Sequence, residues 1–300
     1  MNPRSLKFRP SRPAPVLPEN VPPRLWSRAE LRRGGATPRD LTTAVRSGLL
    51  LRPRRGAYLP SGTDPQVVEA VRCRGRIDCV TLLRRLSVFV IDDRRLHMQI
   101  DPHSTRVAEP DASTVRHWRS TGSADDATVT SLVEALVQAV RCQPPRVAIA
   151  TLDSAWNVGL LDEESLSEVF EALPLPYRRL RNLLDPRAES GIETLVRLIL
   201  RSLGCHVELQ AAIPDVGFVD LLVDGWLIVE CDSRAYHGSW DDHRTDRRRD
   251  AAAVAQGFTT VRLLAAEDVL HRPEWVREAL RRALSHRPVH NSGKRRTRRS

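Results

Sequence analysis

The stretch VDLLVDGWLIVECDSRAYH, residues 219–237, is an apolar segment interrupted by four carboxylates: Asp220, Asp224, Glu230 and Asp232. Its two apolar runs, separated by Asp-Gly, predict two interior strands joined by a tight turn. Alternate residues of a strand share a face, so Glu230 and Asp232 are expected to point the same way and Cys231 the opposite way. Two carboxylates on one face of an interior strand repel each other and lose solvation. The pattern therefore predicts a compensating positive group, most economically a metal ion.

The length of the connecting loop decides whether Asp220 lies beside Glu230. A two-residue turn at Asp224-Gly225 would place the two carboxylates on opposite faces of the sheet. A three-residue loop, residues 223–225 with Gly225 left-handed in a bulge, would place Asp220 opposite Ile228 and beside Glu230. We predict the three-residue loop.

With that loop, Asp220 and Glu230 would offer hard oxygen ligands to Mg²⁺ or Mn²⁺, with water completing the coordination. Such an ion lowers the pKa of a bound water and neutralises charge on a phosphoryl oxygen, as phosphodiester hydrolysis requires. Glu193 is expected near the start of a helix capped by Ser190, from where it would reach the same ion through water. A capping box formed with Ser190 explains Glu193 equally well. Asp224 is expected to be a turn residue only.

The surrounding segments predict a compact α/β domain over residues 185–284, with a mixed sheet flanked by helices. An apolar stripe at helical spacing predicts a helix that ends at Gly204. Strands are expected at about residues 206–210, 218–223 and 226–232. A helix at about residues 246–256, a strand in FTTVRLL and a last helix from Pro273 complete the order.

Three segments between Arg187 and Leu270 carry a resemblance: ESGIETLVRLIL, FVDLLVDGWLIVECDSRAYHGS and DRRRDAAAVAQGFTTVRLLAAEDVL. They resemble a bacterial domain-of-unknown-function family related to the very-short-patch repair endonucleases, in the PD-(D/E)XK restriction-endonuclease-like superfamily. The resemblance implies a nuclease core with Glu193 as the helix acid, Asp220 as the metal-binding aspartate and Glu230 as the acid of the E-x-K motif.

The same resemblance exposes a departure from the superfamily pattern. Asp232 stands where the E-x-K motif has its lysine, as its counterpart does in the related family. Very-short-patch enzymes also lack that lysine and use a nearby histidine, and His237 lies in the corresponding region. We hypothesise that His237, which titrates near neutral pH, acts as general base or phosphate contact. The expected catalytic set is Glu193, Asp220, Glu230, Asp232 and His237.

The net charge of +10 is concentrated at the two ends of the chain. Residues 1–24 carry five Lys and Arg against one acid, and residues 285–300 carry six against none. Tails at residues 1–23 and 285–300 are expected to be disordered. The stretch from Trp26 to Arg55 adds eight Arg against two acids. This distribution indicates a polyanionic partner, most simply nucleic acid, although basic tails without a specific purpose are the alternative.

Residues 24–62 predict a winged helix-turn-helix. SRAE and TPRD are helix starts, with Ser27 and Thr37 as N-caps, and LLLRPRRGAYL predicts a hairpin. The segment SGLLLRPRRGAYL also resembles the N-terminal winged-helix domain of AbiEi-type antitoxins. In this fold the second helix would enter the major groove and the hairpin would reach phosphate or the minor groove, although many winged helices bind protein instead. The expected DNA contacts are Arg39, Arg46, Arg52, Arg54 and Arg55, with Arg234, Arg247 and Arg248 near the nuclease site.

Residues 63–184 are expected to be a mixed and then mainly helical region without a catalytic constellation. Five cysteines are scattered along the whole chain with no C-x-x-C pair: Cys73, Cys79, Cys142, Cys205 and Cys231. This spacing favours free buried thiols over a zinc or redox site.

Together these patterns predict a Mg²⁺-dependent DNA endonuclease that docks through a winged helix. The alternative is an antitoxin-type DNA-binding regulator whose nuclease-like domain is inactive, which the missing lysine favours. RNA is a further substrate option, and a homodimer is a possible oligomeric state. No apolar run approaches the length of a membrane span and no signal core begins the chain, so we expect a cytoplasmic protein that does not bind membranes.

Overall fold

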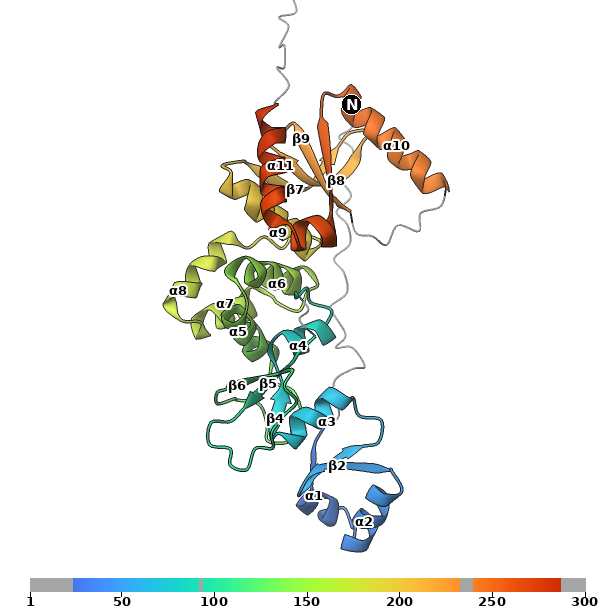
Figure 1. Ribbon diagram of the computed structural model, residues 1–300, viewed down its shortest axis with the longest axis vertical. Helices are drawn as coiled ribbons and strands as arrows, with labels where there is room; N and C mark the ends of the chain where they lie inside the picture. Colours follow the sequence, from blue (N-terminus) through green and yellow to red (C-terminus); the bar gives the residue numbers. More distant parts are fainter. Residues whose placement is uncertain (1–23, 92–93, 233–239, 287–300) are drawn as a thin grey trace, which may run out of the picture. The chain divides into compact units, whose positions relative to one another are not determined.

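The computed structural model describes residues 24–91, 94–232 and 240–286. The chain divides between Pro186 and Arg187 into two compact units (Figure 1), two residues beyond the start expected for the C-terminal domain. Both units are mixed α/β, with sheets flanked by helices. Within the described ranges, no helix has the combination of length and apolar character that crossing a membrane requires.

The first unit begins with two short helices and a hairpin, as the sequence predicts. The helices are α1 (Arg28–Arg33) and α2 (Pro38–Arg46), and each starts with a capping box, at Ser27 and at Thr37. Strands β2 (Leu50–Arg54) and β3 (Ala57–Pro60) form the antiparallel hairpin, and Gly56 takes a left-handed φ of 80° at its turn. The two-residue strand β1 (Trp26–Ser27), which the sequence analysis does not anticipate, pairs with β3.

A second sheet of the first unit has the strand order β4-β5-β6. Its strands are β4 (Gly75–Ile77), β5 (Leu96–Ile100) and β6 (Thr114–Trp118), with β4 antiparallel and β6 parallel to β5. Helices α3 (Pro65–Arg72) and α4 (Cys79–Arg85) flank the short strand β4. A Cβ at Gly75 would lie 2.8 Å from the carbonyl oxygen of Gln99, so the β4–β5 pairing requires glycine there.

Helices complete the first unit, which confirms the mainly helical character expected for its later part. They are α5 (Leu132–Cys142), α6 (Pro145–Asn157), α7 (Glu163–Ala172), α8 (Leu175–Arg178) and the 3₁₀ turn η1 (Arg179–Leu183). Helix α5 packs on α4, α6 and α7. It starts with a capping box between Ser131 and Glu134. Burial would raise the pKa of Glu134, but hydrogen bonds from Thr121, Ser131 and Gly122 outweigh it and lower the pKa to about 2.

A buried ion pair ties the second sheet to the loop before α5. Asp78 is fully buried, and one guanidinium nitrogen of Arg119 lies 2.8 Å from each of its carboxylate oxygens. The hydroxyl of Thr130 donates to the same carboxylate at 2.7 Å, and the backbone nitrogen of Asp78 donates to the carbonyl of His97 at 3.1 Å. The start of α4 is therefore fixed relative to β5, β6 and the residues that lead into α5.

The second unit is built on a four-stranded sheet of order β10-β9-β8-β7. Its strands are β7 (Val207–Ile213), β8 (Gly217–Val223), β9 (Leu227–Asp232) and β10 (Thr259–Leu264), and β9–β10 is the parallel pair. Its helices are α9 (Gly191–Ser202), α10 (Trp240–Ala255), the π turn η2 (Ala265–Leu270) and α11 (Pro273–Ser285). The strand and helix order matches the prediction, although β7 runs three residues further and α10 starts six residues earlier than expected.

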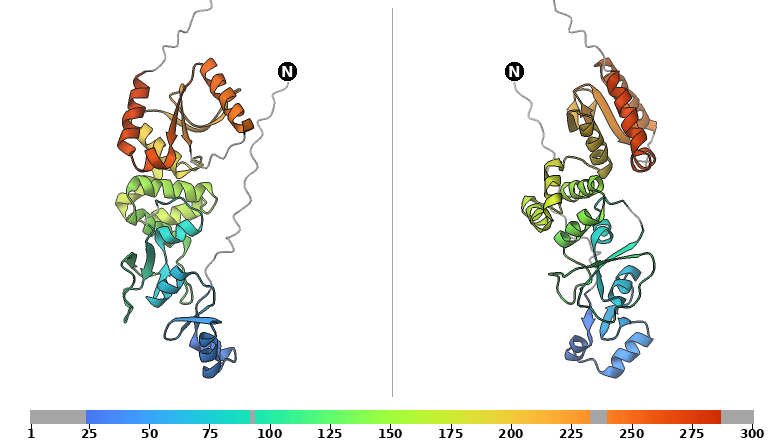
Figure 2. Two further views of the ribbon diagram at one scale, coloured as in Figure 1. Left: turned by 45° about the vertical axis from the view of Figure 1, so that its right-hand side comes forward. Right: turned by 60° about the vertical axis from the view of Figure 1, so that its left-hand side comes forward.

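Helices cover the sheet of the second unit. Helix α9 packs on β7 and β8 and contacts α11, while Ala253 of α10 packs in a buried apolar cluster with Val219 and Ile228. The strands lie between α11 and α10 (Figures 1 and 2). The β8–β9 hairpin is thus an interior element, as its apolar sequence predicts.

Replacing Asp78 with alanine is expected to lower the free energy of unfolding of the first unit by about 3 kcal/mol, because the largely buried Arg119 would lose its close partner and keep only Glu134 at 3.5 Å. Urea denaturation followed by far-UV circular dichroism measures the change. The control is Glu163→Gln, which removes an exposed partner of Arg181 and should change stability by less than about 1 kcal/mol. Equal effects of the two substitutions would contradict the importance of the buried pair.

Candidate functional site

The register of the β8–β9 hairpin brings Asp220 across from Glu230. The ladder pairs Leu221 with Val229, Leu222 with Ile228, and Val223 with Leu227. The connection therefore has three residues, but they are 224–226 and not 223–225. The predicted odd loop is confirmed, whereas the predicted pairing of Asp220 with Ile228 is wrong, because the ladder continues to place Asp220 opposite Glu230.

The shift follows from the way the chain turns at Asp224 and Gly225. Both residues are left-handed, with φ of 48° and 73°, and the backbone nitrogen of Trp226 donates to the carbonyl of Val223 at 3.1 Å. The Trp226 side chain is buried, and its carbonyl accepts from Thr259 at 3.1 Å. Trp226 therefore closes the turn through its backbone nitrogen and bonds to the start of β10 through its carbonyl, and the β8–β9 ladder begins at Leu227.

The two carboxylates lie at the point where β8 and β9 stop exchanging regular ladder bonds. The backbone nitrogen of Cys231 donates to Oδ2 of Asp220 at 2.8 Å, and that of Asp220 lies 3.4 Å from Oε2 of Glu230. Burial, and then the charge of Asp220, raise the pKa of Glu230 to about 7. Glu230 therefore gives up its proton only near neutral pH, because a second negative charge beside Asp220 is unfavourable there. A bound cation would relieve this cost.

Glu193 occupies the third position of α9 and is almost fully buried, with 5% of its surface exposed. Its backbone nitrogen donates to the hydroxyl of Ser190 at 3.2 Å, so Ser190 caps the helix as predicted. The carboxylate does not complete the capping box, because it accepts from the backbone nitrogen of Glu189 at 2.9 Å and from Nε2 of Gln210 at 3.1 Å. Burial first, and the charge of Asp220 in addition, raise the pKa of Glu193. Glu193 therefore binds the backbone just before the N-cap and Gln210 of β7, and it lies near enough to Asp220 to feel its charge.

Two arginines lie near the acidic pair. Arg262 of β10 pairs in register with Glu230. Arg249 approaches from α10. Its Nη2 atom lies 3.8 Å from Oε1 of Glu230, while its Nε donates to the carbonyl of Val216 at 2.7 Å and Nη2 also donates to the carbonyl of Phe218. These carbonyls hold the guanidinium in place. Its charge lowers the pKa of Glu230, but burial and the charge of Asp220 outweigh that effect. The sequence analysis names the neighbouring Arg247 and Arg248, which are exposed, and misses Arg249.

The remaining residues expected at this site are Asp232, Arg234 and His237, and the structure describes only Asp232. Asp232 is half-buried at the end of β9 and pairs in register with Leu264 of β10. Two positions earlier on β10, Arg262 pairs in register with Glu230 and forms an ion pair with Asp250 at 2.5 Å. Arg234 and His237 lie outside the described residues.

The arginines expected to bind DNA are mostly exposed on the first unit. Arg39, Arg46, Arg52 and Arg55 are solvent-exposed, and Arg46 and Arg52 line a pocket between α2 and the β2–β3 hairpin. The other lining residues of this pocket are Arg28, Pro38, Leu41, Thr42, Val45 and Tyr58. Arg54 is half-buried and donates through Nε to the carbonyl of Val71 at 3.0 Å, so it ties the hairpin to α3.

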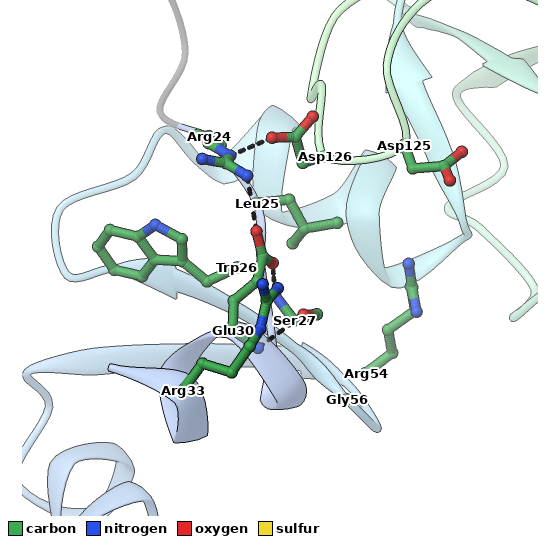
Figure 3. A pocket seen from close by; sticks show the side chains of 10 residues that line it. All are labelled: Arg24, Leu25, Trp26, Ser27, Glu30, Arg33, Arg54, Gly56, Asp125 and Asp126. Carbon is green, nitrogen blue, oxygen red and sulfur yellow. Dashed lines mark hydrogen bonds and ion pairs between the residues drawn. The ribbon is translucent and has the colours of Figure 1, made fainter. Parts of the chain in front are cut away.

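A neighbouring pocket beside α1 has both charge signs in its lining (Figure 3). Arg24 lies between two acids there, 2.6 Å from Glu30 and in an ion pair with Asp126. Glu30 also accepts from the backbone nitrogen of Ser27 at 2.8 Å as part of the capping box. Because Arg24 contacts both acids closely, this pocket differs from the acidic pair of the second unit, where the approach of Arg249 to Glu230 is longer.

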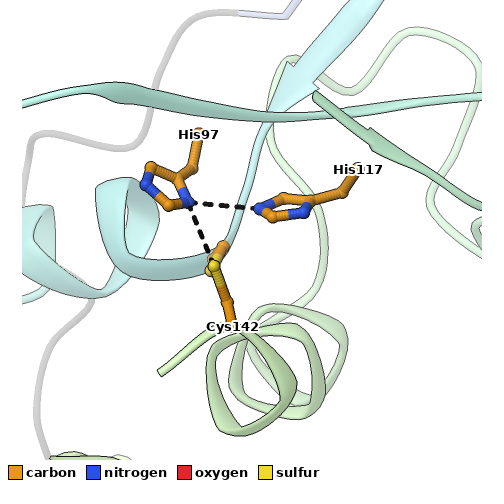
Figure 4. Close-up of side chains that lie close together, drawn as sticks. His97, His117 and Cys142 are labelled. Carbon is orange, nitrogen blue, oxygen red and sulfur yellow. Dashed lines mark hydrogen bonds between the residues drawn. The ribbon is translucent and has the colours of Figure 1, made fainter. Parts of the chain in front are cut away.

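The structure also assembles a cluster that the sequence analysis missed. Ligand atoms of Cys79, His97, His117 and Cys142 all lie within 4.8 Å of one another. Nδ1 of His97 lies 3.2 Å from Nε2 of His117 and 3.8 Å from Sγ of Cys142 (Figure 4). Across the described ranges, no other group of three or more His, Cys, Asp and Glu side chains converges in this way. These residues could hold a metal ion.

The expectation for the cysteines therefore needs correction. All five are free thiols, but Cys142 is exposed, while Cys205 and Cys231 are half-buried. Hydrogen bonds from Cys79, then from His117 and His97, lower the pKa of the Cys142 thiol well below its ordinary value. The residues of the cluster are 18 or more positions apart in sequence, so spacing rules for zinc motifs do not find them.

No family model matches this chain. No curated protein is significantly similar to it either. The geometry of the two sites therefore carries the functional argument.

Replacing Glu230 with glutamine is expected to stabilise the metal-free protein at pH 8 and to leave its stability unchanged near pH 4. The folded state keeps a proton on Glu230 up to about pH 7, whereas the unfolded chain releases it near pH 4.5. Wild type therefore loses stability as the pH rises between these values, and the neutral amide does not. A difference of about 1–3 kcal/mol should develop across this window.

Urea denaturation in EDTA at several pH values measures this difference. Glu208→Gln, on the exposed side of β7, is the control and should show no such dependence on pH. A Glu230→Gln protein that is less stable than wild type at pH 8 would show that the ionised carboxylate does not destabilise the folded state.

Proposed function

We propose that this protein is a metal-dependent endodeoxyribonuclease that hydrolyses phosphodiester bonds at Asp220 and Glu230. The observation that supports the proposal best is the pairing of these two carboxylates across β8 and β9 with the pKa of Glu230 raised to about 7. A half-buried acidic pair of this kind is an unfavourable arrangement unless a cation binds there. The four-stranded mixed sheet with α9 against it is compatible with a restriction-endonuclease-like core.

The donor atoms fit a hard divalent cation. Carboxylate oxygens of Asp220 and Glu230 are the ligands that Mg²⁺ and Mn²⁺ prefer. When bound, such an ion would supply charge neutralisation at a phosphoryl oxygen and a lowered pKa for a water. The bond from Cys231 to Asp220 orients one ligand, and Glu193 with Gln210 extends the polar wall beside it.

Two further groups would serve the substrate. Arg249, held by the carbonyls of Val216 and Phe218 beside Glu230, is placed to contact a phosphate oxygen. Asp232 stands where the superfamily has lysine, so the positive charge and proton acceptor that lysine provides there have to come from other groups. We propose His237 for that role, with Arg234, Arg247 and Arg248 as phosphate contacts.

The first unit would supply the docking surface for DNA. We propose that α1, α2 and the β2–β3 hairpin form a winged helix-turn-helix, with α2 in the major groove. Arg28, Arg46 and Arg52 line one pocket between these elements, and no acid lines it. Arg52 also lies over the ring of Tyr58 at 5.9 Å, which holds its side chain at the surface.

The second candidate function is an antitoxin-type DNA-binding regulator with an inactive nuclease-like unit. Two observations favour it: the aspartate in the lysine position and the approach of Arg249 to within 3.8 Å of Glu230. A close ion pair between Arg249 and Glu230 would take the place of the metal ion. The protein would then bind nucleic acid without cleaving it.

Glu230→Gln is expected to abolish plasmid cleavage in Mg²⁺ or Mn²⁺, by at least about 100-fold, because one charged metal ligand is lost. Binding to a DNA duplex in EDTA should remain as in wild type. Agarose gels report cleavage, and fluorescence anisotropy reports binding. Asp224→Asn, in the turn of the same hairpin, is the matched control and should still cut.

The outcomes separate the two candidates. Wild type that nicks DNA only with a divalent ion supports the enzyme. Wild type that binds duplex DNA without cutting in either metal supports the regulator, and Glu230→Gln that cuts normally removes Glu230 from the mechanism.

Arg46→Ala and Arg52→Ala are each expected to weaken duplex binding and to reduce the slope of log affinity against log salt by about 1, because each arginine would release one condensed counterion. Anisotropy titrations at several salt concentrations measure the slope. Arg179→Ala, on an exposed turn of the same unit, should leave the slope unchanged. If all three substitutions act alike, the pocket between α2 and the hairpin is not the docking surface.

A further inference from the structure

The Cys79, His97, His117 and Cys142 cluster belongs to the first unit and is separate from the acidic pair of the second unit. Its donor set is two thiols and two imidazole nitrogens. That is one of the three common donor sets of structural zinc sites, whereas Mg²⁺ and Mn²⁺ prefer oxygen. The chemistry of the cluster thus differs from that of the proposed nuclease site.

The separations between the donor atoms agree with tetrahedral zinc. Ordinary zinc–nitrogen and zinc–sulfur bonds at tetrahedral angles place two nitrogens about 3.4 Å apart and a nitrogen and a sulfur about 3.6 Å apart. The observed distances are 3.2 Å between His97 and His117 and 3.8 Å between His97 and Cys142. These two separations therefore agree with a tetrahedral ion, and the distances to Cys79 lie within the 4.8 Å that spans the cluster.

Each ligand comes from a different element of the first unit. Cys79 is the first residue of α4, His97 lies on β5, His117 on β6, and Cys142 is the last residue of α5. In the parallel β5–β6 register Gln99 pairs with His117, so His97 and His117 are two positions out of step on one face. A bound ion would cross-link two strands and the ends of two helices that pack against each other.

The backbone around the ligands is held in place by other contacts. Cys79 has a left-handed φ of 53°, which is unfavourable for a residue with a Cβ, yet it follows Asp78 in the buried ion pair with Arg119. The backbone nitrogen of His97 donates to the hydroxyl of Thr81 at 2.9 Å. These contacts aim Cys79 and His97 at the same point before any ion binds.

We propose that Cys79, His97, His117 and Cys142 bind one Zn²⁺ as a closed structural site. With four protein ligands no coordination position is left for substrate, so the ion would hold the β4-β5-β6 sheet against α4 and α5 and would take no part in chemistry. Two other arrangements of the same residues are a metal-free hydrogen-bonded cluster and an oxidised Cys79–Cys142 pair.

The test uses the untagged full-length protein, purified under reducing conditions, exposed to zinc and then desalted. Inductively coupled plasma mass spectrometry should find about one zinc per chain, and cobalt substitution should give the absorption of a tetrahedral site with thiolate ligands. Cys142→Ser, chosen because Cys142 is exposed and its loss leaves the core intact, should retain less than about a tenth of that zinc. His117→Gln should do the same.

The controls locate the ion. Cys73→Ser, which changes another thiol of the same unit, and Asp220→Asn, which changes the proposed magnesium site, should both keep the zinc. A chelator should lower the melting temperature of wild type and not that of Cys142→Ser. Wild type without stoichiometric zinc, zinc loss from Cys73→Ser as large as from Cys142→Ser, or a Cys79–Cys142 disulfide detected by mass would each overturn the proposal.

Discussion

The acidic site depends on one constraint, the register of the β8–β9 hairpin. A strand places alternate side chains on opposite faces, so a shift by one residue would have separated Asp220 from Glu230. The three-residue connection at residues 224–226 keeps them on one face and directly opposed. The turn itself is built from two left-handed residues, Asp224 and Gly225, and is closed by the bond from Trp226 to Val223. The backbone conformation of the turn thus determines where the two carboxylates meet.

Much of the fold follows from local sequence signals. The caps at Ser27, Thr37 and Ser190 and the apolar stripe of α9 predict helices that the structure contains. The strands on either side of Asp224-Gly225 are also where the apolar runs place them. These features depend on neighbours within a few residues, so a single sequence is enough to find them. The short strands β1 and β4 carry too few residues to show a period and were missed.

The sites were less accessible to sequence analysis because they depend on pairing between distant elements. Arg249 differs from its neighbours Arg247 and Arg248 only by the side of α10 that it occupies, and the run of arginines carries no signal for that. Likewise, His97 and His117 are ordinary strand residues until the parallel β5–β6 register puts them on one face. Cys142 joins them only because α5 ends beside that face. Each of these contacts joins residues that are distant in sequence, so no local sequence pattern predicts it.

Arg54 gives the β2–β3 hairpin a mechanical property that its exposed neighbours do not share. Its bond to the carbonyl of Val71 fastens the tip of the hairpin to α3, so this hairpin is not a free arm that samples many orientations. A partner that binds Arg52 or Arg55 therefore contacts a hairpin whose orientation is already restricted. Binding there costs less conformational entropy than binding to a mobile arm. Loss of the bond between Arg54 and Val71 would make the hairpin more mobile, while its exposed arginines would keep their charge.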